Sequence, residues 1–98
     1  MFTKLSGAWG VSSIEGFTVV RRGSPLTQFV IEYSEAGRSL RYALENLGPG
    51  SIQPIAVAAI GPWLPPHAHE VISPAQQHQI ADRIVQAMFF LGDKFAVV

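Results

Sequence analysis

The sequence contains no cysteine and few charged residues. Without cysteine it has no disulfide, no thiolate nucleophile and no cysteine-ligated zinc, so the fold depends on its hydrophobic core. Hydrophobic residues make up 48% of the chain and charged residues only 14%, which excludes disorder for most of the chain and predicts apolar surface that a partner or a second copy would cover. Seven basic and seven acidic residues give a net charge of zero, so direct binding to nucleic acid is not expected.

Long hydrophobic runs are missing as well. No stretch approaches the roughly 18 apolar residues of a membrane span. Residues 1–10 contain a single lysine and no apolar run of signal-peptide length. We therefore expect a cytoplasmic protein with no membrane partner. The length predicts a single domain over residues 1–98, because a chain of this size supports only one core.

The pattern of residues 29–45 predicts a β-hairpin with a Glu-Ala-Gly-Arg turn. Apolar residues alternate with polar residues on both sides of that turn. The register that places Tyr33 opposite Leu40 also places Glu32 opposite Arg41 on the other face. The glycine of the turn is free to adopt the positive φ angle that a short hairpin loop needs.

Further strands are predicted on both sides of this hairpin. Residues 17–22 predict a preceding strand, so the sheet begins as a meander. Residues 48–50 predict a break, and the apolar run 52–60 predicts a central strand covered on both faces, with Pro54 at its start. Residues 94–98 predict a closing strand that pairs with the same sheet.

One helix is predicted near the C-terminus. Ser73 is followed by Pro74 and, three residues after the cap, by Gln76, which is the sequence signature of a capped helix start, and Gly92 supplies the stop. Val85 and Phe89 lie outside the apolar stripe of this helix. The stripe consists of Ile80, Ala81, Ile84, Ala87, Met88 and Leu91. The sequence therefore predicts an α+β fold, an antiparallel meander of about five strands with one C-terminal α-helix packed on one face.

The segment 61–71 carries three prolines and is predicted to be a loop. His67, His69 and Glu70, with His78 nearby, are ligand types for zinc, but no further ligand follows at a recognisable spacing. We interpret them as a solvated loop and expect no metal and no cofactor. Trp63 fits either an aromatic plug of the core or a binding anchor, and the plug is favoured.

No catalytic constellation is recognised. Ser12 and Ser13 are interpreted as turn residues, not as a nucleophile in a strand-turn-helix elbow. The carboxylates considered for a catalytic pair have basic neighbours, Glu32 in the predicted register and Asp82 in the sequence. We therefore expect that the protein is not an enzyme.

The order of these features resembles small immunity proteins encoded beside bacterial polymorphic toxins and contact-dependent growth-inhibition toxins. The resemblance rests on the hairpin 29–45, the Gly-Pro-Trp-Leu-Pro segment 61–65, the Ser73-Pro74 helix start and the closing Phe-Ala-Val-Val strand, and it spans residues 17–98. It implies a cytoplasmic, non-enzymatic antidote that binds and blocks one cognate toxin domain. A nuclease is one candidate target, although antidotes to nucleases are frequently acidic and this chain is neutral.

Three groups are predicted to be available to such a partner. They are Glu35 and Arg38 at the hairpin tip, His67, His69 and Glu70 in the loop, and Asp82 and Phe89 on the helix. Two alternatives remain open. The chain could be a small-ligand or metal-binding subunit that uses the loop 67–70 and Trp63, or a homodimeric scaffold with Val85 and Phe89 at the contact.

Overall fold

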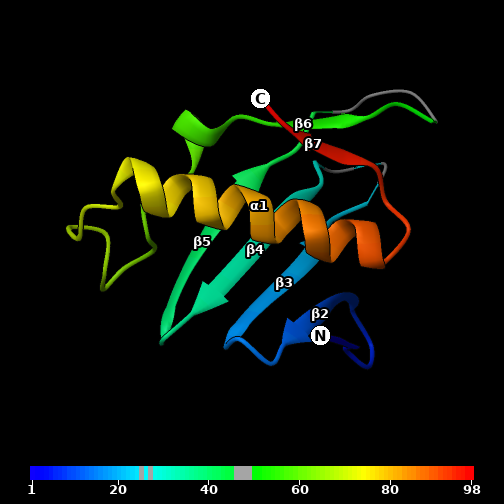
Figure 1. Ribbon diagram of the computed structural model, residues 1–98, viewed down its shortest axis with the longest axis horizontal. Coiled ribbons are helices and arrows are strands. Elements are labelled where there is room, and N and C mark those ends of the chain that lie inside the picture. Colours follow the sequence, from blue (N-terminus) through cyan, green and yellow to red (C-terminus); the bar gives the residue numbers. More distant parts are fainter. Residues whose placement is uncertain (25, 27, 46–49) are drawn as a thin grey trace.

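The structure is a computed structural model that describes residues 1–24, 26, 28–45 and 50–98. The main sheet has five strands, β1 (Phe2–Lys4), β2 (Trp9–Ser13), β3 (Phe17–Arg22), β4 (Val30–Glu35) and β5 (Arg38–Ala43). The remaining elements are β6 (Gln53–Ile55), the 3-10 helix η1 (Val57–Ala59), α1 (Pro74–Phe90) and β7 (Phe95–Val97). Figure 1 shows α1 crossing one face of the main sheet. The fold is α+β, as the sequence predicts.

Each strand of the main sheet pairs antiparallel with its sequence neighbour, so the sheet is a meander. In the β4–β5 hairpin Tyr33 lies opposite Leu40 and Glu32 lies opposite Arg41, which confirms the predicted register. Gly37 in the turn has a φ angle of 77°, the left-handed conformation expected for it. The local alternation of apolar and polar residues was therefore sufficient to fix this part of the sheet.

The first two strands come from residues for which no strand was predicted. Ser12 and Ser13, interpreted as turn residues, lie in β2. Val11 in the same strand is fully buried opposite Val19 of β3. A side chain on Gly10 would place its Cβ 2.7 Å from the Val19 carbonyl oxygen, so the close approach of these strands requires glycine. Gly10, Ser12 and Ser13 have low strand propensity, so the sequence pattern of β2 did not indicate a strand, although its Val11 is part of the core.

The apolar run 52–60 does not form the central strand predicted for it. It is divided between β6 and η1, and Pro54 is the middle residue of β6 rather than its first. Pro54 cannot donate to a ladder, and Ala58 is exposed, so neither residue fits a strand covered on both faces. The predicted closing strand exists as β7, but it pairs in parallel with β6 and not with the main sheet. Residues 48 and 49 of the predicted break lie outside the described residues.

Helix α1 begins and ends where the sequence predicts. The Ser73 hydroxyl accepts from the Gln76 N–H at 3.2 Å, and the Gln76 side chain accepts from the Ser73 N–H at 3.0 Å. Gly92 has a φ angle of +92°, and the following Asp93 N–H donates to the Met88 carbonyl at 2.8 Å, which caps the last turn. Within the described residues no helix is both long and apolar enough to cross a membrane.

The core lies between α1 and the main sheet. All of the predicted stripe residues are buried, namely Ile80, Ala81, Ile84, Ala87, Met88 and Leu91. A row of aromatic rings crosses the sheet, with centroid separations of 6.0 Å for Phe2 and Phe17, 5.8 Å for Phe17 and Tyr33, and 6.4 Å for Tyr33 and Trp63. Trp63 is only 5% exposed, which confirms that it plugs the core.

The face of the sheet opposite α1 offers a test of the register. Glu32 lies between two arginines, 3.4 Å from Arg41 and 3.2 Å from Arg22. We expect a double-mutant cycle of Glu32→Gln and Arg41→Gln to give a coupling free energy of at most about 1 kcal/mol, because the arginines are largely exposed. Urea denaturation at low and high salt measures it, and the coupling should shrink with salt. Zero coupling at low salt would contradict the pairing, and an exchange of the two charges should restore only part of the attraction because Arg22 remains.

Candidate functional site

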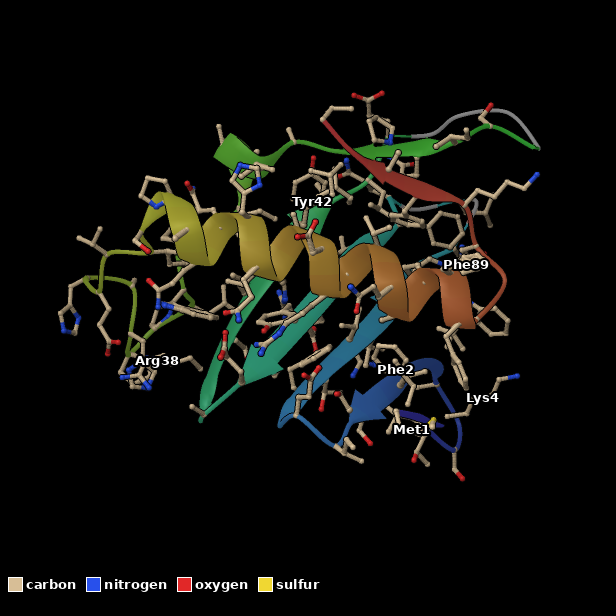
Figure 2. The ribbon with its side chains drawn as sticks, in the orientation of Figure 1. Met1, Phe2, Lys4, Arg38, Tyr42 and Phe89 are labelled. Carbon is tan, nitrogen blue, oxygen red and sulfur yellow. The ribbon has the colours of Figure 1, made fainter. Side chains whose placement is uncertain are left out.

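The residues predicted to bind a partner come from the β4–β5 hairpin tip, the loop before α1 and α1 itself. Glu35 and Arg38 at the hairpin tip lie beside the loop that holds His67, His69 and Glu70, because Arg38 and Glu70 form an ion pair. Asp82 and Phe89 occupy exposed positions of α1. Figure 2 shows Arg38 and Phe89 near opposite ends of the helix. The structure therefore joins the hairpin tip with the loop and places Phe89 away from both (Figure 2).

The hairpin tip is fastened to the loop by one carboxylate. The Arg38 Nε donates to Glu70 Oε1, and His67 Nδ1 lies 2.7 Å from Glu70 Oε2. The hydrogen bond from Arg38 and that from His67 lower the pKa of Glu70 to about 2. All three side chains are about one-third exposed. The loop expected to be free in solvent is thus bound to the sheet through Glu70.

This cluster predicts a pH dependence of stability. The pKa of Glu70 falls from its ordinary value of 4.5 to about 2 on folding, so its contribution is fully present above about pH 4.5 and is lost as the pH falls toward 2. Glu70→Gln should therefore lower the melting temperature at pH 7 and approach the wild type near pH 2. The matched control is Glu45→Gln, since Glu45 is exposed and forms no ion pair with any described residue. If the difference in melting temperature between Glu70→Gln and wild type stays constant from pH 7 to pH 2, the lowered pKa of Glu70 is contradicted.

Glu35 belongs to a second cluster, with Tyr33 and Arg83. The Arg83 guanidinium donates to the Tyr33 hydroxyl at 2.9 Å, and that hydroxyl donates to Glu35 Oε1 at 3.0 Å. Burial raises the pKa of Tyr33 to about 12, so the phenol remains protonated. Arg83 also lies over the Phe17 ring at 4.6 Å from its centroid. These contacts connect α1 to β4 and β3 and give Glu35 an internal role.

His69 is the exposed member of the loop. It lines a cavity of about 290 Å³ together with Glu70, Ile72 and Gln77. Across residues 1–24, 26, 28–45 and 50–98, no group of three histidine, aspartate or glutamate side chains is placed to hold a metal ion. His67 instead pairs with Glu70 in the ion-pair cluster with Arg38.

Phe89 protrudes beside an apolar groove at the C-terminal end of α1. Its side chain is 71% exposed. The groove has a volume of about 530 Å³ and runs between α1, the start of β7 and β1. Its lining consists of Phe2, Ile52, Val85, Gln86, Phe89, Asp93, Lys94, Phe95 and Ala96. Figure 2 shows Phe2 and Phe89 at the same end of the molecule.

The sequence predicted only the helical side of this groove. Val85 and Phe89 were recognised as lying outside the buried stripe. Phe2 and Phe95 were not recognised, because each belongs to a strand of only three residues that gives no clear periodicity. Both are partly buried, and their position beside Phe89 depends on how β1 and β7 pack against α1. The only available signal was the apolar, charge-poor composition.

The two ends of α1 therefore differ in chemistry. The apolar groove lies at the C-terminal end of the helix, and the ion pair of Arg38 with Glu70 presents partly exposed charges toward the other end. No family model matches the chain, and neither a curated protein nor a solved structure is significantly similar to it.

Proposed function

We propose that this chain is an immunity protein that binds a cognate bacterial toxin domain in the cytoplasm and blocks it by occlusion, without catalysing a reaction. The observation that carries the proposal is the apolar groove beside the protruding Phe89. A ring that is 71% exposed next to an apolar groove costs solubility unless a partner covers it. The sequence resemblance to immunity proteins supplies the class of partner.

The polar clusters support binding rather than chemistry. Tyr33, Glu35 and Arg83 satisfy one another, and so do Arg38, His67 and Glu70. A group that serves as an acid, base or nucleophile needs access to a substrate, whereas these groups are held by their neighbours. They brace the loop and the hairpin tip, so that a partner meets a rigid surface with little loss of conformational freedom.

The first experiment measures stoichiometry against the toxin domain encoded beside this chain. Inhibition of toxin activity in vitro should be complete at about one chain per toxin domain, because occlusion consumes one inhibitor for each target. Titration of toxin activity gives the ratio of chain to toxin needed for inhibition, and calorimetry gives the ratio of the two in the complex. Inactivation that proceeds with time at a small fraction of that ratio would show turnover and would replace the proposal with an enzymatic one.

The second experiment locates the interface. Three variants are compared. The first carries Glu35→Ala and Arg38→Ala together, the second carries His69→Ala alone, and the third carries Asp82→Ala and Phe89→Ala together. The variant that lacks Phe89 should lose the most affinity, about 2 kcal/mol or more, since an exposed aromatic side chain beside a groove is a typical anchor. Melting temperatures identify any loss that arises from unfolding. If only the hairpin-tip variant loses affinity, the interface lies at the other end of α1.

A homodimeric scaffold is the second candidate function, and the same groove favours it. Val85 lines the groove with Phe89, and two copies could cover these side chains by pairing their helices. Sedimentation velocity of the free chain distinguishes the two. A dimer that Phe89→Ser converts to a monomer would support the scaffold.

A further inference from the structure

The charges around the apolar groove differ from those elsewhere on the molecule. Each of the five arginines lies within ion-pair distance of a carboxylate, at separations of up to 3.6 Å. The two lysines of the sequence, Lys4 and Lys94, form no ion pair with any of the residues that the structure describes. The arginines are therefore paired within the fold, whereas the two lysines have no ion-pair partner among the described residues.

One lysine lines the groove, and the other lies at the same end of the molecule (Figure 2). Lys94 is part of its lining, next to Phe95. Lys4 is two residues from Phe2 in β1, so both side chains are on the same face of the sheet, and Figure 2 shows Lys4 with Phe2 and Phe89 at one end of the molecule.

The one carboxylate in the lining is already neutralised. Asp93 accepts from Arg21 at 3.1 Å and from the Trp9 indole N–H at 2.8 Å. Arg21 in turn lies over the Trp9 and Phe29 rings, at 5.8 and 5.1 Å from their centroids, and is held in place. The rim of the groove consequently has a net positive charge, although the whole chain is neutral.

We infer that the groove receives an amphipathic helix of the partner protein whose apolar face is flanked by carboxylates. The inference rests on the proposed function and specifies the chemistry of the partner. Apolar side chains spaced by three or four residues would enter the groove and cover Phe89 and Phe2. Carboxylates beside them would face Lys4 and Lys94, which steers the approach and excludes basic segments.

The test uses two synthetic peptides of about 16 residues, roughly four helical turns. Both have leucine and phenylalanine along one face, and the flanking positions are glutamate in one peptide and lysine in the other. The acidic peptide should bind about tenfold or more tightly than the basic one, and the difference should shrink with salt. Amide shifts in a titration followed by nuclear magnetic resonance should concentrate at residues 2–4, 85–89 and 93–96.

Two variants and a matched control make the result specific. Phe89→Ser should weaken the acidic peptide by about tenfold, whereas Leu26→Ser, which removes another exposed side chain away from the groove, should leave affinity unchanged. The double variant Lys4→Glu and Lys94→Glu should reverse the preference between the peptides. Equal binding of both peptides, or binding that ignores Phe89, would overturn the inference.

The failure of this inference is distinguishable from failure of the proposed function. If the toxin domain is bound and blocked equally well by wild type and by Phe89→Ser, the function stands and the groove is not its site. If the acidic peptide binds as expected but the toxin is not blocked, the groove is assigned and the toxin is the wrong partner. If the free chain is a dimer that Phe89→Ser separates, a second copy occupies the groove and the inference is overturned.

Discussion

Replacing Trp63 with alanine should lower the free energy of unfolding by about 3 to 5 kcal/mol. Trp63 is 5% exposed, and its ring is stacked on that of Tyr33, so truncation leaves a large cavity at the end of the aromatic row. Domains of this size have a total stability of about 5 to 15 kcal/mol, and the variant should be close to unfolding. Urea denaturation followed by far-ultraviolet circular dichroism measures the loss.

Trp63→Phe is the control, because it retains an aromatic ring against Tyr33 and should lose clearly less stability than the alanine variant. It also leaves Trp9 as the only tryptophan. Trp9 is 43% exposed, so the fluorescence of Trp63→Phe should be that of a partly solvated indole, whereas Trp9→Phe should retain the emission of a buried one. A stable Trp63→Ala variant that has lost only partner binding would identify Trp63 as an anchor and not as a plug.

Ile84→Ala should cost about 2 to 5 kcal/mol. Ile84 is fully buried in the middle of α1, where it belongs to the same core cluster as the apolar residues of the main sheet. Its truncation removes contacts with both layers at the position least able to relax. The change is measured by chemical denaturation with an unchanged dependence on denaturant concentration, which shows that the folded state is intact.

His69→Ala is the comparison for this variant. Its side chain is exposed in the loop before α1, and its removal should change stability by no more than about 0.5 kcal/mol. A loss at position 69 that equals or exceeds the loss at position 84 would show that the loop, rather than the helix stripe, holds the fold together.

The parts of the fold that could be predicted are those specified by neighbouring residues. The register of β4 and β5 follows from the alternation of side chains and from the charge pair Glu32 and Arg41. The bounds of α1 follow from Ser73 at the cap and Gly92 at the stop. Both features depend on patterns that span fewer than about 20 residues, for which sequence reading is most reliable.

The parts that could not be predicted depend on distant contacts. β1 is stabilised by its pairing with β2 and by Phe2 packing on Phe17 and Phe90, none of which is visible in a segment of three residues. The pairing of β6 with β7 joins segments that are separated by α1. An apolar run was read as a central strand because composition alone does not show whether a segment is covered on both faces.

The candidate site was predicted only in part, because some of its contacts join residues that are far apart in the sequence. Phe89 was correctly recognised as lying outside the buried stripe. The ion pair of Arg38 with Glu70 joins residues 32 positions apart, so the sequence treated the hairpin tip and the loop as separate groups. The bond from Arg83 to Tyr33 spans 50 positions, and it gave Glu35 an internal partner that no local pattern indicated.

The two edges of the main sheet bear on how this protein can associate. Strand edges are the usual route to aggregation, because their free backbone groups add further strands. β1 offers an edge of only three residues and ends in Lys4, a charge that disfavours strand addition. At the β5 edge the Leu64 N–H donates to the Ser39 carbonyl at 2.7 Å, and the prolines beside Leu64 have no N–H with which to extend a ladder. With both edges blunted, the main sheet offers little backbone template for a further strand, so an association of this sheet with another chain would depend on its side chains.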